Sequence, residues 1–543
     1  MLDRLENEPH WVVVALDYEL GYLLEPKAAP ADWQADENRP LARFWRFAQR
    51  ISWSASEAED WLAERAGAGA AGVGGVQPTI SESDYLAAVD RIKSLIADGD
   101  CYQVNYTFAL GFEWFGTPLE LYRRLRERQP VSYGGVVGDA RGGLVSLSPE
   151  LFLERRGARL ATRPMKGTLP RSLPAEQLRI SEKDLAENLM IVDLLRNDLG
   201  RIADNGSVVV DRLFEIEDYP TVWQMVSEVS AEVGSCGFDA VLRALFPCGS
   251  ITGAPKIRAM QIAAELEVGP RGGYTGALGW LAPNGDFRLN VAIRTLELSA
   301  GGVGKLGIGS GIVADSQPAA EWQECLLKAS FLRDCDPGLK LIETLRREDG
   351  QYPRLGGHLA RLRRSATWLG FALDESELLG QLAAQPAIGA WRVRLTLAKS
   401  GEIEVQSFAL PAEAVGVRRA WLADAKIDST NPLRRHKTTE RQVYDEALAS
   451  LAGDSSIFDV VFLNERGEVA EGARSNVFVD CDGVLLTPPL SSGCLPGVLR
   501  AELLDSGRAR EAIVRPEDLV SGFWLGNALR GLIRVELQRD LTA

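Results

Sequence analysis

Hydrophobic positions follow two different periods along this chain. Trp11–Leu16 is continuously apolar, which is typical of a buried strand. After Ser81-Glu82-Ser83-Asp84, a typical helix start, apolar residues recur three or four positions apart, which predicts an amphipathic helix. A second amphipathic helix is predicted around Ala186–Asp198, with an apolar stripe made of Leu185, Leu189, Val192, Leu195 and Leu199. Because such helices alternate with strand-like runs throughout, we predict the α+β class.

Two breaks in this pattern divide the chain. The run from Arg65 to Gly75 contains little except Ala and Gly, so we expect a flexible loop over residues 65–76. Near Asp334–Gly338 a helical pattern ends in Pro-Gly, a stop signal, and a strand pattern begins at Leu339. We therefore predict one domain over residues 1–335 and another over residues 339–543.

Composition narrows the possible classes of protein. The chain has 543 residues, 46% of them hydrophobic and 25% charged, as in ordinary globular proteins of two or three domains. Its net charge of -15 argues against binding to nucleic acid or to an anionic membrane, but small anionic substrates need only a local basic pocket. Seven scattered Cys, no leader-like amino terminus and no long apolar run predict a cytoplasmic protein that does not span a membrane.

Lys166 is the first candidate for catalysis. It lies in the tight run Pro164–Thr168, and Glu150 precedes it by 16 residues. A desolvated Lys loses its proton readily and becomes a nucleophile, and a nearby carboxylic acid can then donate a proton. Taken alone, the run is more typical of a surface loop whose Lys forms an ion pair.

Three carboxylates form the second candidate site. Glu187 lies off the apolar stripe of its predicted helix, and Glu321 and Glu324 share one face of another helix. Oxygen ligands with open positions suit Mg²⁺, although acidic helix faces are more often simply solvated.

A Gly-rich run and a lone Arg could bind an anion. Gly307–Ile312 follows the probable strand Lys305–Leu306, and successive backbone N–H groups in a Gly-rich loop form an anion-binding nest. Arg294 stands in the apolar run Val291–Leu296, either as an outward-facing strand residue or as a pocket residue that binds a carboxylate.

Six runs in order resemble the chorismate-utilising enzymes. They are Cys101–Tyr106, Ser148–Glu150, Pro164–Thr168, Phe246–Lys256, Gly309–Gly311 and Glu321–Glu324. The resemblance covers about 335 residues and implies a two-layer β-sheet sandwich flanked by helices. Anthranilate synthases carry Ala where Lys166 stands, and isochorismate and salicylate synthases carry Lys where Gln103 stands. The combination found here resembles the branch that leads to 4-aminobenzoate.

The resemblance also implies roles for individual residues. Lys166 would add to ring C2 of chorismate while Glu150 protonates the departing C4 hydroxyl, and ammonia would then attack C4 and expel Lys166. Mg²⁺ would be held by Glu187, Glu321 and Glu324. The implied substrate-binding residues are Gln103, Thr252, Lys256, Tyr274, Arg294, Gly309, Ser310 and Gly311, of which Tyr274, Arg294 and the Gly309–Gly311 amides would hold the pyruvyl carboxylate.

The second domain resembles the fold-type IV pyridoxal-phosphate enzymes, which have two subdomains. The resemblance rests on Gly357–Leu362, Arg434–Thr439, Glu468–Phe478 and Leu495–Arg500. It implies Lys437 as the Schiff-base Lys and Glu471 as the partner of the pyridine nitrogen. Arg361, with the amides of Val498 and Leu499, would bind the phosphate of pyridoxal 5'-phosphate, Thr344 would lie near the substrate, and a homodimer through this domain is possible.

Together the two resemblances indicate a bifunctional enzyme that makes 4-aminobenzoate from chorismate and ammonia. Two alternatives stay open, namely a second domain that is an aminotransferase of other specificity or an inactive structural module. The chain has neither a Gly-x-Cys-x-Gly run nor a His-Pro-Glu run, so we expect a separate glutamine amidotransferase subunit to supply the ammonia.

Overall fold

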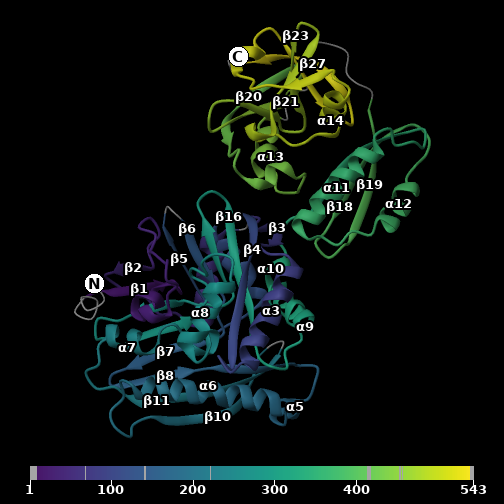
Figure 1. Cartoon of the computed structure of the whole chain (residues 1–543). Coiled ribbons are helices and arrows are strands. Elements are labelled where there is room, and N and C mark those ends of the chain that lie inside the picture. Colours follow the sequence, from purple (N-terminus) through teal and green to yellow (C-terminus); the bar gives the residue numbers. More distant parts are fainter. Residues whose placement is uncertain are drawn as a thin grey trace. The chain divides into compact units, whose positions relative to one another are not determined.

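The computed structural model describes residues 9–67, 69–139, 142–219, 222–411, 418–451, 454 and 456–538. The chain divides into two compact units (Figure 1). The first consists of the described residues up to Gly67 with Val76–Phe112 and Thr117–Cys335. The second consists of the described residues from Asp336 onward together with Glu113–Gly116 and the described part of 68–75.

The first unit contains two β-sheets. The nine-stranded sheet has the order β10 (Val209–Asp218), β11 (Val222–Glu232), β8 (Arg159–Arg163), β7 (Leu151–Arg156), β14 (Phe287–Val291), β13 (Ala277–Leu281), β1 (Trp11–Leu16), β2 (Ala42–Phe47), and β9 (Met165–Pro170) pairs with β11. The seven-stranded sheet has the order β12 (Gly253–Ala254), β4 (Gln103–Phe115), β16 (Val303–Ile312), β15 (Thr295–Ser299), β6 (Gly142–Ser146), β5 (Gly135–Asp139), and β3 (Gly72–Pro78) pairs with β4. Ala15 and Leu278 of the first sheet pack on Leu144 of the second, as the predicted two-layer sandwich requires.

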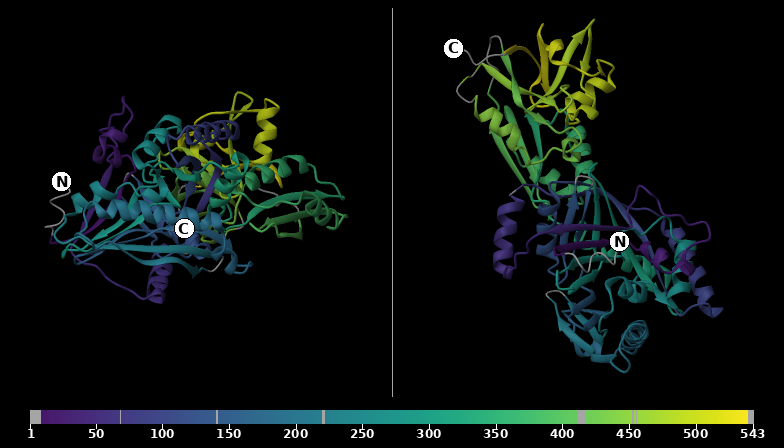
Figure 2. Two further views of the ribbon diagram at one scale, coloured as in Figure 1. Left: turned by 60° about the horizontal axis from the view of Figure 1, so that its bottom comes forward. Right: turned by 90° about the vertical axis from the view of Figure 1, so that its left-hand side faces the viewer.

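Ten α-helices flank these sheets among the described residues of the first unit. They are α1 (Leu20–Leu24), α2 (Ala55–Ala66), α3 (Glu82–Ala97), α4 (Pro118–Arg128), α5 (Glu176–Arg179), α6 (Glu182–Gly200), α7 (Phe238–Leu245), α8 (Lys256–Leu266), α9 (Pro318–Lys328) and α10 (Ser330–Arg333). The long helix α6 lies along β10 and β11 (Figures 1 and 2). Ser81 caps α3 by accepting a hydrogen bond from the backbone N–H of Asp84, as its sequence predicts.

The second unit contains two subdomains, as expected. A three-stranded sheet, β17 (Leu341–Glu348), β18 (Ala390–Leu397) and β19 (Ile403–Ala409), packs with α11 (Leu355–Leu369) and α12 (Glu375–Ala383) around one apolar core. An eight-stranded sheet has the order β22 (Val469–Gly472), β21 (Ile457–Asn464), β20 (Arg418–Ile427), β27 (Gly531–Gln538), β26 (Phe523–Asn527), β23 (Asn476–Cys481), β24 (Val484–Thr487), β25 (Ala509–Glu511), with helices α13 (Gln442–Ala449) and α14 (Val498–Asp505). The α+β class is confirmed for both units.

The prediction of a flexible loop over residues 65–76 is wrong at both ends of that range. Helix α2 continues to Ala66, and β3 begins at Gly72. A Cβ atom at Gly74 would lie 2.3 Å from the ring of Trp368, so this glycine serves close packing rather than flexibility. The apolar stripe predicted for α6 is also wrong at Leu189, which is 52% exposed, whereas the neighbouring Asn188 is fully buried.

None of the helices in the described parts of the chain is both long enough and apolar enough to cross a membrane.

Two candidate active sites

Lys166 and Glu150 form the centre of the first site. Lys166 is the second residue of β9, and Glu150 directly precedes β7. Burial raises the pKa of Glu150 to about 7, although Ser250, the Lys166 charge and the Met165 backbone N–H oppose the shift. Burial lowers the pKa of Lys166, against the charges of Glu150 and Glu187. The site therefore favours a protonated acid beside a neutral amine, the two forms that the chemistry needs.

A residue that the sequence did not single out holds the acid in place. The hydroxyl of Ser250 donates a hydrogen bond to Oε1 of Glu150 over 2.7 Å. Ser250 lies in the 3-10 helix η3 (Gly249–Ile251), within the run that carried the family resemblance. Cys248 lies 3.2 Å from the same hydroxyl, and burial with the Glu150 charge raises its pKa to about 12, which keeps the thiol neutral.

The three carboxylates expected to bind Mg²⁺ come from two helices, α6 and α9. Glu187 and Glu324 are close enough for the charge of Glu324 to raise the pKa of Glu187, after the larger effect of burial. Glu324 also contacts Lys328 at 2.8 Å, and Glu321 accepts a hydrogen bond of 2.8 Å from Ser316. Among the described residues no group of three acidic, His or Cys side chains is gathered closely enough to hold a metal ion. The three carboxylates thus offer the oxygen ligands that Mg²⁺ prefers, but they are not drawn together in this structure.

The Gly-rich run at residues 307–312 is part of strand β16, not a loop, so the predicted nest is wrong. Its glycines give room to neighbouring groups instead. A Cβ at Gly307 would lie 2.1 Å from the ring of Tyr274, one at Gly309 would lie 2.4 Å from the carbonyl of Tyr106, and one at Gly311 would lie 2.2 Å from Nε2 of Gln103. Ser310, between them, contacts the hydroxyl of Tyr85 at 2.9 Å.

Gln103 and Tyr274, which these glycines accommodate, are both buried polar side chains. Oε1 of Gln103 is buried without a hydrogen-bond partner among the described residues. A buried acceptor without a partner is costly and is expected where a ligand completes the site. Burial raises the pKa of Tyr274 well above its usual value, so this side chain remains a neutral donor.

Arg294 is not a strand residue, since β14 ends at Val291 and β15 begins at Thr295. Its φ of 50° lies in the left-handed region, which is uncommon for a residue other than Gly and frequent at functional sites. Burial lowers the pKa of its guanidinium, against the effect of Tyr219. This geometry favours the pocket interpretation of Arg294 over the outward-facing one.

Two of the expected substrate-binding residues have local partners. Lys256 forms an ion pair of 2.6 Å with Asp198 and donates to the carbonyl of Leu245 at 3.0 Å. The hydroxyl of Thr252 donates to the carbonyl of Cys248 at 2.8 Å. Both contacts fix the turn that carries Ser250, so they position the acid as well.

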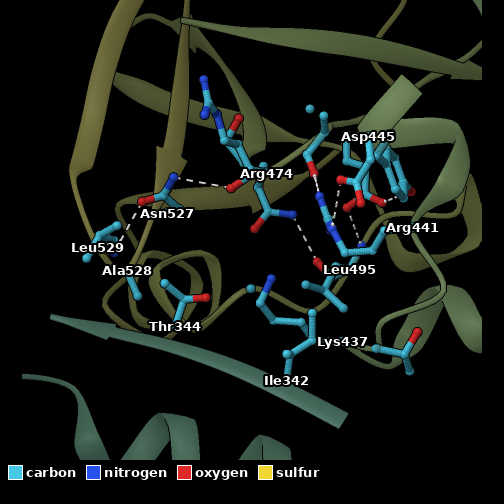
Figure 3. Close-up of a pocket in the computed structure, with 18 of the residues that line it drawn as sticks. Ile342, Thr344, Lys437, Arg441, Asp445, Arg474, Leu495, Asn527, Ala528 and Leu529 are labelled. Carbon is cyan, nitrogen blue, oxygen red and sulfur yellow. Dashed lines mark hydrogen bonds and ion pairs between the residues drawn. The ribbon is translucent and has the colours of Figure 1, made fainter. Parts of the chain in front are cut away.

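The second site surrounds a cavity of about 780 Å³ in the second unit (Figure 3). Lys437 and Thr344 both point into it, and Glu471 also lines it. Burial lowers the pKa of Lys437 to about 8, helped by the charges of Arg441 and Arg361. A Lys with a lowered pKa is suited to Schiff-base chemistry.

Glu471 is held at the wall of this cavity by two donors. The hydroxyl of Tyr444 donates to Oε1, and the backbone N–H of Leu495 donates to Oε2 over 2.9 Å. Burial raises the pKa of Glu471. A fixed carboxyl of this kind suits a pyridinium nitrogen, and the sequence missed Tyr444 because it lies seven residues after Lys437 on the separate helix α13.

The amino end of α14 offers hydrogen-bond donors to an anion. Val498 and Leu499 are its first two residues, whose N–H groups have no intrahelical acceptor, and Gly497 supplies no side-chain cap. Gly497 and Gly357 leave room here, because a Cβ at Gly357 would lie 2.7 Å from Val498 Cγ1. Gly497, Val498 and Arg361 line the same cavity, so the residues present fit a phosphate group.

Arg361 is positioned by a carboxylate that the sequence did not assign. Glu343 accepts hydrogen bonds from Nε of Arg361 at 2.8 Å and from its Nη2 at 2.6 Å, and it contacts Nδ1 of His358 at 2.7 Å. Burial alone would raise the pKa of Glu343, but these partners lower it to about 2. Glu343 orients one edge of the guanidinium, while Nη1 donates a hydrogen bond to the carbonyl of Pro496.

Comparison with known proteins gives two family matches. Residues 2–334 match the model of the chorismate binding enzymes, and residues 340–537 match amino-transferase class IV. The chain belongs to the chorismate binding enzyme family. It joins a domain similar to aminodeoxychorismate synthase to an amino-transferase class IV domain.

Individual relatives agree with this assignment. Aminodeoxychorismate synthase of Streptomyces griseus is 42% identical over 269 residues, which cover 48% of this chain and 36% of the relative. Aminodeoxychorismate synthase component 1 of Klebsiella aerogenes is 41% identical over 259 residues, 46% of this chain and 57% of the relative. The matched segment thus spans about half the length of these relatives or less. The structure of anthranilate synthase component I from Streptococcus pneumoniae matches with 26% identity and a TM-score of 0.52, over 61% of this chain and 83% of that one.

Proposed function

We propose that this chain makes 4-aminobenzoate in two steps. The first unit would convert chorismate and ammonia to 4-amino-4-deoxychorismate, and the second would eliminate pyruvate from that compound. The observation that carries the proposal is the opposed pKa shifts of Lys166 and Glu150, which favour an uncharged nucleophile beside a protonated acid. Relatives of the anthranilate type are also similar to the chain, and Lys166 is the residue that separates the two reactions.

The first unit would act through its own side chains. Lys166 would form a bond to ring C2 while Glu150 gives its proton to the C4 hydroxyl, which leaves as water with the shift of the ring double bond. Ammonia would then bond to C4, and the electrons would return through the ring to expel Lys166. Gln103, the first residue of β4, and Arg294, between β14 and β15, would hold the substrate. Glu187, Glu321 and Glu324 would hold Mg²⁺, a charge that would neutralise a substrate carboxylate.

The second unit would use pyridoxal phosphate, which stabilises negative charge on the carbon next to a bound amine. Lys437 would anchor the cofactor and move protons at the substrate amine carbon and ring. Glu471 would hold the pyridine nitrogen, and Arg361 with the amides of Val498 and Leu499 would hold the phosphate. An aminotransferase of other specificity is the alternative, and the fusion favours the lyase because it would consume the product of the first unit.

Ammonia would come from a separate glutamine amidotransferase subunit, since the relatives named component 1 indicate a second component. A cytoplasmic homodimer formed through the second unit completes the proposal.

Product analysis tests this function. The purified chain is incubated with chorismate, Mg²⁺, ammonium and pyridoxal phosphate, and the products are separated and identified by mass. We expect 4-aminobenzoate and pyruvate in equal amounts. Anthranilate as the main aromatic product would overturn the first step, and a lasting pool of the 4-amino intermediate would overturn the second.

A further inference from the structure

The cavity around Lys437 is basic although the chain as a whole is acidic. Eight Lys and Arg side chains line it, against four carboxylates, whereas the net charge of the chain is -15. A cleft lined mainly by one sign of charge attracts ligands of the opposite sign. The cavity therefore suits an anion with more charge than the phosphate end alone would need.

Most of the arginines around this cavity are already engaged. Arg361 is fixed by Glu343, Arg434 donates to the hydroxyl of Tyr444 at 2.9 Å, and Arg441 donates to the carbonyl of Ala473 at 2.6 Å. Arg474 donates to the carbonyl of Phe458. These contacts shape the cavity wall and leave those side chains less free to bind a substrate.

Arg392 and Arg394 on β18 are different. Both are exposed and line the cavity, and neither guanidinium has a hydrogen-bond or ion-pair partner among the described residues. The ring of Phe408 lies 4.7 Å from the Arg392 guanidinium and supports it from one side. Arg394 is directly opposite Thr344 in the sheet, so the two side chains share the face that looks into the cavity. Arg392 lies two residues away on that face, about 7 Å along the strand.

We infer that Arg392 and Arg394 recognise the two carboxylates of a dianionic amine, and so set the substrate class of the second site. This inference rests on the proposed function. In 4-amino-4-deoxychorismate the ring carboxylate lies across the ring from the amine, and the second carboxylate lies on the ether beside it. An amine at Lys437 therefore leaves both carboxylates pointing away from the cofactor. Two guanidinium groups, each able to fork onto a carboxylate, match that arrangement.

The same feature separates the lyase from an aminotransferase that acts on simple amino acids. A substrate with one carboxylate and an apolar side chain would leave a guanidinium next to that side chain without a partner. The site then discriminates against such a substrate, since it is costly to desolvate the second guanidinium without pairing its charge.

The test uses benzene-1,3-dicarboxylate, which has two carboxylates and no amine, with benzoate as its one-carboxylate counterpart. Binding is followed through the visible absorption of the bound pyridoxal phosphate, so only the second cavity contributes to the signal. The variant is Arg392→Gln/Arg394→Gln, and the control is Arg363→Gln, an exposed Arg that pairs with Glu375 on the surface and does not line the cavity.

We expect the double variant to bind the dicarboxylate about tenfold or more weakly, because each charged hydrogen bond lost has an effect of that order. Benzoate, which can pair with only one of the two guanidinium groups, should lose less affinity than the dicarboxylate. The cofactor spectrum should change little, and Arg363→Gln should behave like the wild type. An unchanged dicarboxylate affinity in the double variant, or a wild type that prefers benzoate, would overturn the inference. Failure of the wild type to consume 4-amino-4-deoxychorismate in a separate turnover assay would instead overturn the proposed function, and the binding assay does not depend on that result.

Discussion

At the scale of single residues, the acid Glu150 is the group that the structure describes most sharply. Its raised pKa of about 7 means that about half of it is protonated, and able to donate a proton, in neutral solution, and most of it at lower pH. Chorismate amination should therefore decline as pH rises above about 7 when the concentration of free ammonia is held constant.

Ser250→Ala should move this decline to higher pH. The hydroxyl of Ser250 stabilises the charged carboxylate, so its loss raises the pKa of Glu150, by about one unit for one hydrogen bond to a charge. The measurement is the pH profile of kcat for chorismate consumption.

Ser148→Ala is the matched control for that profile, because its hydroxyl contacts the backbone of Glu150 and Val291 rather than the carboxylate. An alkaline limb that stays in place in Ser250→Ala, or moves equally in Ser148→Ala, would show that Ser250 does not tune the acid.

At the scale of secondary-structure elements, helices α6 and α9 have to bring separate carboxylates to one ion. Glu187→Gln should lower the apparent affinity of the enzyme for Mg²⁺ by about tenfold or more, since it removes one charged oxygen ligand. A Mg²⁺ titration of chorismate amination measures the effect, with the exposed Glu182→Gln on the same helix as control. Wild-type activity that survives chelation would rule out the metal assignment.

Strand β17 and helix α11 are joined by the buried ion pair of Glu343 with Arg361. Glu343→Gln would leave the buried guanidinium without its counter-charge, which costs about 3–5 kcal/mol of stability. Thermal unfolding with cofactor absent measures this loss, and Glu375→Gln, which breaks an exposed pair with Arg363, should change little.

The loss should depend on pH. The folded-state pKa of Glu343, about 2, lies below the usual value of about 4.3, so its stabilisation is present above about 4.3 and is lost as pH falls toward 2. Equal destabilisation by the two variants near neutral pH would contradict this role for Glu343.

The sequence predicted helices and strands better than it predicted how side chains pack between them. Period and capping located α3 and the strand β1, and ordered motifs located Lys166 and Lys437. The Gly-rich pattern of Gly307–Ile312 predicts a loop, because the sequence cannot show that Tyr274 and Gln103 pack against glycines of this run. The helical period predicts a buried Leu189, because it does not reveal that Asn188 turns inward to accept a hydrogen bond from Ser227.

At the scale of the whole molecule, the two sites lie in separate units and each should work without the other. The source of nitrogen is the first consequence. Supplied with glutamine alone, the purified chain should form no aminated product, whereas ammonium at high pH should support turnover. Turnover with glutamine, after removal of contaminating glutaminase, would show that the chain supplies its own ammonia.

The most direct test of the central claim, two successive reactions on one chain, is a mixing experiment with Lys166→Ala and Lys437→Ala. Each folded variant is incubated with chorismate, Mg²⁺, ammonium and pyridoxal phosphate, alone and together, and 4-aminobenzoate is measured over time. We expect neither variant alone to form it, Lys437→Ala to accumulate 4-amino-4-deoxychorismate, and the mixture to form 4-aminobenzoate. Formation of 4-aminobenzoate by either variant alone would contradict the account.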